Sequence, residues 1–179
     1  MYSIKRFLPL ICLLCFIAPL SHADDGYVEI KAGGKPDAFL CGFDVNKTTM
    51  KEIFAKLGKE DKREPDPEES REATFSWVRG SLKISAIAWT IYEYPNRHPE
   101  GIEVEGADPE KFCGTGRGIF LGDSIDHARK IYAQDKGRGK FSVKKAENVT
   151  FKWGEEDTTV YFDIDKDRTI TAVGVTAIP

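Results

Sequence analysis

Cysteine and histidine are scarce in this chain, and their scarcity restricts its chemistry. The 179 residues contain four cysteines and three histidines. The sequence has neither a Gly-x-Ser-x-Gly elbow nor a His-Glu-x-x-His pair, which are typical of α/β-hydrolases and zinc proteases. A catalytic triad or dyad would have to use His98 or His127, and we interpret both as ordinary surface histidines. We therefore predict that the chain is not an enzyme and that it holds no metal or cofactor.

The chain also lacks a strong charge of either sign and, after residue 20, a long apolar run. Its formal net charge is −3, which argues against a nucleic-acid binder because such proteins present a basic face. Residues 1–23 combine a basic start, an apolar stretch and a small-residue end, as a secretory signal peptide does. The alternative, a membrane anchor, requires about 18 to 20 apolar residues. We expect cleavage near Ala23 and a periplasmic or secreted product without a stable membrane anchor.

Two cysteines, Cys41 and Cys113, remain after this cleavage. An even pair in an exported protein predicts a disulfide, with two buried free thiols as the alternative. The pair also occupies equivalent places in a short repeat, because Leu40-Cys41-Gly42 is echoed by Phe112-Cys113-Gly114. Duplicated units packed about a pseudo-twofold axis would bring the two copies together.

Each copy of the repeat leads into a helix pattern. The apolar spacing predicts a helix over residues 49–58, where Thr49 and Glu52 have the spacing of a capping box. The second copy begins at residues 123–126, and its inward-facing positions are Ile125, Ala128 and Tyr132.

Strand patterns follow each helix. Residues 27–30 are a candidate edge strand, and the other expected strands are 74–77, 82–94, 102–105, 148–153, 158–164 and 169–176. This order predicts an α+β fold of two tandem helix-plus-antiparallel-sheet units, with the helices packed on one face of the sheet. The expected divisions of the chain are a signal peptide 1–23, a lead-in segment 24–36, a first unit 37–108 and a second unit 109–179.

The repeated order of glycine, polar cap, short helix and strand meander resembles the β-lactamase-inhibitor-protein-like tandem repeat. The stretch Gly118-Ile119-Phe120-Leu121-Gly122-Asp123-Ser124 is similar to the helix entry of such modules and of the SmpA/OmlA group of outer-membrane lipoproteins. The chain differs from the SmpA/OmlA group in having two units and no lipobox. The resemblance implies a periplasmic or secreted binding module and does not name a partner.

Aromatic residues on the predicted strands are the candidate partner-binding residues, because exposed aromatic side chains are typical interface anchors. An alternative is that the repeat-equivalent tryptophans pack beneath the helices. Two loops, 59–72 and 135–147, carry opposite net charges and could steer a charged partner. The candidates are Trp77, Trp89, Tyr92, Tyr94, Trp153 and Tyr161.

These observations favour a non-catalytic protein-binding module whose partner is an exported or periplasmic protein. An inhibitor or immunity protein against an exported enzyme or toxin is the most concrete form of this hypothesis. An envelope-assembly or structural factor is the alternative, and an enzyme of unrecognised type ranks third.

Overall fold

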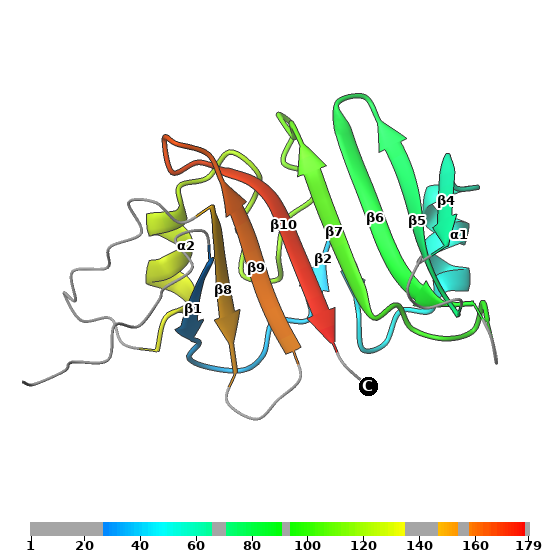
Figure 1. Cartoon of the computed structure of the whole chain (residues 1–179), viewed down its shortest axis with the longest axis horizontal. Coiled ribbons are helices and arrows are strands. Elements are labelled where there is room, and N and C mark those ends of the chain that lie inside the picture. The colour runs from blue at the N-terminus through cyan, green and yellow to red at the C-terminus, as the bar shows by residue number, and fades with distance from the viewer. Residues whose placement is uncertain (1–26, 66–70, 91–93, 135–146, 154–157, 178–179) are drawn as a thin grey trace, which may run out of the picture.

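A computed structural model describes residues 27–65, 71–90, 94–134, 147–153 and 158–177 (Figure 1). The predicted signal peptide, Tyr92 and most of the basic loop 135–147 lie outside the described residues. The helices are α1 (Met50–Leu57) and α2 (Ile125–Tyr132). The strands are β1 (Tyr27–Lys31), β2 (Phe39–Leu40), β3 (Phe43–Asp44), β4 (Lys62–Pro65), β5 (Glu72–Arg79), β6 (Leu82–Trp89), β7 (Gly101–Gly106), β8 (Asn148–Lys152), β9 (Thr158–Ile164) and β10 (Ile170–Ala177).

Eight of these strands form one sheet in the order β1-β8-β9-β10-β7-β6-β5-β4 (Figure 1). The last strand of each half, β7 or β10, lies at the centre, and the two pair with each other in antiparallel register. Strand β1 closes one edge by pairing in parallel with β8, which confirms the expected edge strand. The two halves of the chain therefore share one continuous sheet.

The predicted fold class, α+β with two tandem helix-plus-antiparallel-sheet units, is wrong. The structure is mostly β: each helix is only eight residues long, and the strands form one large mixed sheet. The prediction failed because the β7–β10 pairing joins segments about 70 residues apart, and local periodicity carries no information about such a contact. The parallel β1–β8 pair was missed for the same reason.

Both helices begin where their caps predict. Thr49 accepts a hydrogen bond from the backbone N–H of Glu52, whose carboxylate accepts one from the N–H of Thr49, so the capping box of α1 is complete. Ser124 caps α2 in the simpler way, by accepting from the N–H of Asp126. As predicted, Ile125, Ala128 and Tyr132 are the buried residues of α2.

Two segments differ from their predicted structure. The charged stretch 59–72, predicted to be a loop, contains β4, and all four residues of β4 are exposed at the sheet edge. Lysine and proline on an edge strand discourage pairing with another chain, so a charged composition is compatible with a strand there. Strand β6 ends at Trp89, before the predicted end at Tyr94, and residues 91–93 of the predicted strand lie outside the described residues.

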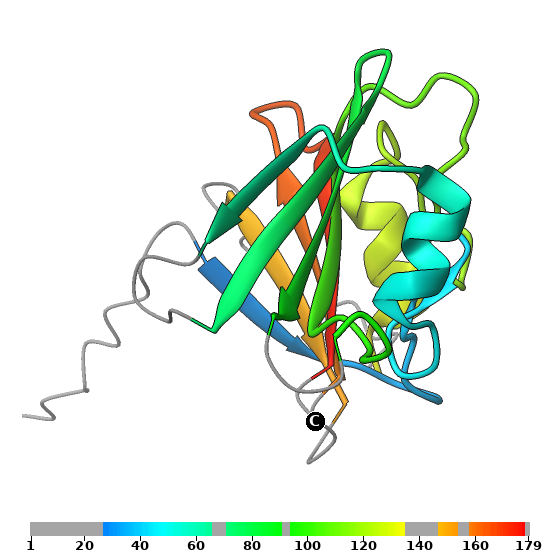
Figure 2. The same cartoon turned by 90° about the vertical axis from the view of Figure 1, so that its right-hand side faces the viewer.

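Each helix packs against aromatic side chains of its own half of the sheet. Phe54 of α1 contacts Phe75 and Trp77 of β5, with ring centroids 5.5 and 5.6 Å apart. Tyr132 of α2 contacts Phe151 and Trp153, at 5.3 and 5.8 Å. Figure 2 shows both helices on the same side of the sheet. Alternate strand residues point to opposite faces, so these contacts identify the face of the sheet that the core covers.

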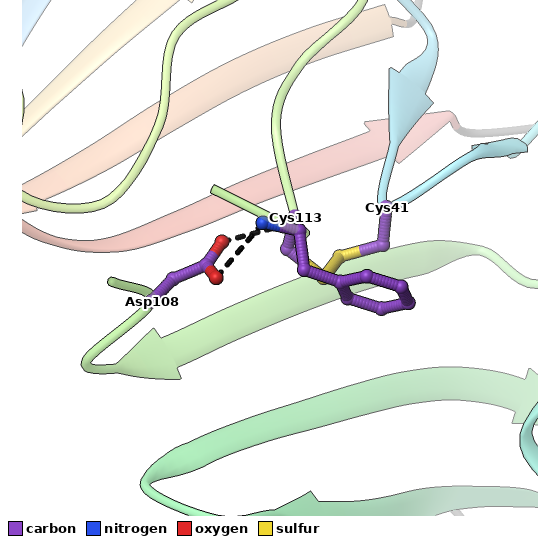
Figure 3. Close-up of a disulfide and its surroundings, with 4 residues drawn as sticks. Cys41, Asp108 and Cys113 are labelled. Carbon is purple, nitrogen blue, oxygen red and sulfur yellow. Dashed lines mark hydrogen bonds between the residues drawn. A yellow bond between two sulfur atoms is a disulfide. The ribbon is translucent and has the colours of Figure 1, made fainter. Parts of the chain in front are cut away.

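The Cys41–Cys113 disulfide is confirmed and joins residues 72 positions apart in the chain (Figure 3). The repeated tripeptides lie together, since the N–H of Cys41 donates to the carbonyl of Gly114 at 3.2 Å. Asp108 holds the backbone around the second cysteine in place. Its carboxylate accepts hydrogen bonds from the backbone N–H groups of Phe112 and Cys113, at 2.8 and 2.7 Å. A disulfide is compatible with an exported protein. In the described part of the chain, neither helix has the length and apolar character to cross a membrane.

A buried polar cluster attaches the lead-in segment to α2. Asp37 is 5% exposed and accepts hydrogen bonds from the hydroxyl of Tyr132 at 2.6 Å and the backbone N–H of Arg117 at 3.0 Å. The Arg117 guanidinium lies over the rings of Tyr132 and Trp153, and it donates to the backbone carbonyls of Gly33 and Ile131. We call Asp37, Arg117 and Tyr132 the lead-in clasp.

Candidate functional site

The side of the sheet that faces away from the helices is the candidate site, and we call it the open face. Its side chains are those that alternate with the core-facing residues of each strand. On β5, for example, Phe75 and Trp77 contact α1, whereas Val78 faces the other way and is 52% exposed. The open face extends over the strands of both halves (Figure 2).

Residues that pair directly across neighbouring strands form rows on the open face. A central row runs from one sheet edge to the other and is almost entirely polar. From β1 to β4 it consists of Glu29, Thr150, Tyr161, Gly174, Glu103, Ser85, Ser76 and Lys62. Since Gly174 lies on β10 and Glu103 on β7, the row crosses the seam where the two halves meet.

Tyr161 spans this seam. A Cβ atom placed on Gly174 would lie 1.9 Å from the Tyr161 ring, so the ring rests directly on the glycine backbone. Beyond the glycine, the Tyr161 hydroxyl donates to the Glu103 carboxylate at 2.5 Å. The absence of a side chain at position 174 therefore lets one residue of β9 bond to a residue of β7, two strands away.

Replacing Gly174 by alanine should lower the free energy of unfolding by about 2 kcal/mol, because the new methyl group overpacks against the Tyr161 ring. Urea unfolding of the oxidised protein measures this change. In a Tyr161→Ala background the clash is gone, and the same Gly174→Ala change should then be nearly neutral. Equal destabilisation in both backgrounds would contradict the contact.

Two tyrosine hydroxyls are held protonated. Burial is the larger cause and the hydrogen bond to Glu103 the smaller, and together they raise the pKa of the Tyr161 hydroxyl well above 10.0. Burial and the hydrogen bond to Asp37 raise the pKa of Tyr132 in the same way. A raised folded-state pKa contributes stability that is present below pH 10 and is lost as the pH rises above it, because the unfolded chain releases the proton first.

The free energy of unfolding should therefore fall steadily as the pH rises above about 10, with each of the two phenols contributing up to about 1.4 kcal/mol per pH unit. Urea unfolding at a series of alkaline pH values gives the slope. Tyr161→Phe should make the slope shallower, whereas an unchanged slope in that variant would show that the Tyr161 phenol ionises without unfolding.

Other polar groups on the open face pair across strands. Lys83 on β6 forms a 2.7 Å ion pair with Glu105 on β7, and this hydrogen bond raises the pKa of the lysine. The hydroxyls of Ser76 and Ser85 lie 3.1 Å apart, and those of Thr159 and Thr176 lie 2.6 Å apart. Such pairs restrict the rotamers of these side chains across neighbouring strands.

Apolar exposure on the open face is concentrated in the first half. Val78 of β5 and Ile87 of β6 are 52% and 38% exposed, and both belong to the open face by alternation. Trp89 ends the same strand and is partly buried. The Val78 and Ile87 side chains lie on opposite sides of the central row, since Val78 pairs with Lys83 and Ile87 with Thr74.

The predicted binding residues that the structure describes do not lie on one surface. Trp77 and Trp153 are 0% and 5% exposed beneath the helices, so in this structure they are core residues, which is the alternative stated for them above. Tyr94 is partly buried, stacked on Phe75 on the helix-facing side. Tyr161 lies on the open face, whereas Trp89 lies at the end of the sheet beside Arg97. Tyr92 lies outside the described residues.

Sequence reasoning missed Val78, Ile87 and Glu103. Period-two alternation could have found them, because each is an immediate neighbour of a core residue on its strand. They were not among the candidates because only tryptophan and tyrosine residues were considered as interface anchors. The two histidines, His98 and His127, are exposed as predicted.

No family model matches the sequence, and no curated protein matches it at a significant level. Among solved structures, the fold is similar to that of a cysteine-rich secretory protein from Staphylococcus aureus, with a TM-score of 0.57 and 13% identity. That match covers 84% of this chain and 50% of the staphylococcal protein, so the chain spans half the length of that protein. A DUF4309 family protein from Bacillus subtilis matches with a TM-score of 0.42 and 17% identity, over 76% of this chain and 83% of that one. At these identities the likeness concerns the fold only.

Proposed function

We propose that this chain is an exported, non-catalytic protein-binding module that binds its partner through the open face. The observation that supports the proposal most is the polar central row, in which residues from all eight strands line up on the face of the sheet away from the helices. Thr150, Ser85 and Ser76 are the buried side chains of this row, and its other polar side chains reach the surface. Val78 and Ile87 provide apolar contact area beside this row. The disulfide and the predicted signal peptide support a periplasmic or secreted location after cleavage near Ala23.

The most concrete form of this function is inhibition of an exported enzyme or toxin. A rigid sheet face can cover a large partner surface without rearranging its backbone. The resemblance to the β-lactamase-inhibitor-protein-like repeat supports this form, and the similarity to the SmpA/OmlA group supports the envelope-assembly alternative.

Affinity capture with the oxidised chain 24–179, from secreted and envelope extracts, tests the proposal. We expect one soluble exported protein, retained at one-to-one stoichiometry in size-exclusion chromatography of the purified pair. If that protein is an enzyme, its activity should fall in proportion to the complex formed. Enrichment of membrane-protein assemblies would favour the alternative function, and a chain that captures no protein stoichiometrically would contradict the proposal.

A further inference from the structure

A second recognition site lies at the end of the sheet where β6 and β10 end and β7 begins. Here the structure has a hollow of about 350 Å³, which is within the size range of small-ligand pockets. Trp89 and Arg97 line it, together with Asn46, His98 and Glu100. Its lining comes from four separate parts of the chain, so it forms only in the folded protein.

Two donors at this hollow lack acceptors among the described residues. The indole Nε1–H of Trp89 is shielded from solvent and has no hydrogen-bond partner there. Buried polar groups are normally hydrogen-bonded, and an unpaired one destabilises the fold. The guanidinium of Arg97 lies 5.6 Å from the centre of the Trp89 ring and donates to no acceptor in the part of the chain that the structure describes.

The backbone holds Arg97 in place over Trp89. The first N–H groups of α1 donate to the loop, since Met50 donates to the carbonyl of Arg97 and Lys51 to that of Pro95, both at 2.8 Å. On the other side of the loop, Glu100 donates to the carbonyl of Ile87 at 2.8 Å. The backbone of residues 95–100 is therefore anchored to α1 and to β6, and the guanidinium lies over the Trp89 ring.

We propose that this hollow binds a carboxylate group. A guanidinium presents paired N–H donors that match the two oxygens of a carboxylate. A carboxylate bound to Arg97 would lie beside the Trp89 ring and change the environment of its indole. Arg97 and His98 are the basic residues of the lining, and the amides of Asn46 and Asn96 add further donors. Glu100 is the acidic residue of the lining and has contacts of its own. The carboxylate belongs either to a free small organic acid or to an acidic side chain of a protein.

Nuclear magnetic resonance of the indole N–H groups tests this proposal. The described chain has three tryptophans, and the other two indoles are already bonded: Trp77 donates to Gly58 and Trp153 to Gly33. Titration with sodium glutarate should shift the Trp89 resonance in a saturable way and leave the other two in place. Trp89→Phe assigns the resonance.

Arg97→Gln should weaken this binding at least about tenfold, as expected for loss of a charged hydrogen-bond donor, and unchanged Trp77 and Trp153 resonances would show that the variant is folded. A blocked Gly-Glu-Gly peptide distinguishes the two sources: binding of both probes indicates a protein side chain, and binding of glutarate alone indicates a free acid. The proposal is overturned if Trp89 does not shift, if neutral glutaramide shifts it equally, or if Arg97→Gln binds as well as the parent. The test does not depend on whether the open face binds a protein.

Discussion

Replacing both Cys41 and Cys113 by alanine should lower the free energy of unfolding by about 4 kcal/mol. The bond closes a loop of 72 residues, and in the chain-entropy model a loop of this length removes much of the freedom of the unfolded state. The same bond joins the β2–β3 turn to the segment between β7 and α2 (Figure 3). Urea unfolding of the oxidised parent and of the double variant measures the difference.

A reducing agent provides the control for this prediction. It should destabilise the parent by the same amount as the double substitution and leave the double variant unaffected. A loss below about 1 kcal/mol in the variant would mean that hydrogen bonding between the two repeat copies, and not the covalent link, holds them together.

Changing Asp37 to asparagine should cost about 3 kcal/mol, although the side chain keeps its shape. The buried carboxylate accepts from the hydroxyl of Tyr132 and the N–H of Arg117 through the same oxygen, and from the N–H of Phe39 through the other. An amide replaces one of these acceptors with a donor, so at least one buried N–H or O–H group is left unpaired. The midpoint of urea unfolding reports the loss.

Asp126→Asn is the matched control for the lead-in clasp. Asp126 forms a 2.7 Å ion pair with Arg168, but its side chain is 56% exposed. Exposed ion pairs contribute between 0 and about 1 kcal/mol, so this variant should stay close to the parent. Similar losses for the two variants would show that Asp37 is more accessible to water than its 5% exposure indicates.

Local elements of this fold could be predicted because their causes are local. Thr49 and Glu52 form a capping box whose partners lie three residues apart, and the inward positions of α2 follow from helical periodicity. The disulfide could be predicted because an exported chain with two remaining cysteines offers a single pairing.

The sheet could not be predicted, because its arrangement depends on pairing between distant segments. The pairing of Glu103 on β7 with Gly174 on β10 places the two halves in one sheet, and no local pattern around either residue indicates it. The candidate site was only partly predictable for the same reason. Trp77 and Trp153 have the same aromatic character as Trp89, and only the positions of the helices decide which rings are covered.

The most direct test of the open face compares two single substitutions of exposed apolar residues. Ile87 lies on the open face, whereas Phe112 is 56% exposed beside the end of α1, away from that face. The measurement is the dissociation constant of the captured partner for Ile87→Glu and for Phe112→Glu, by isothermal titration calorimetry. Binding through the open face predicts that Ile87→Glu weakens affinity at least about tenfold and that Phe112→Glu leaves it unchanged. Equal affinities for the parent and Ile87→Glu, or a loss confined to Phe112→Glu, would contradict the account.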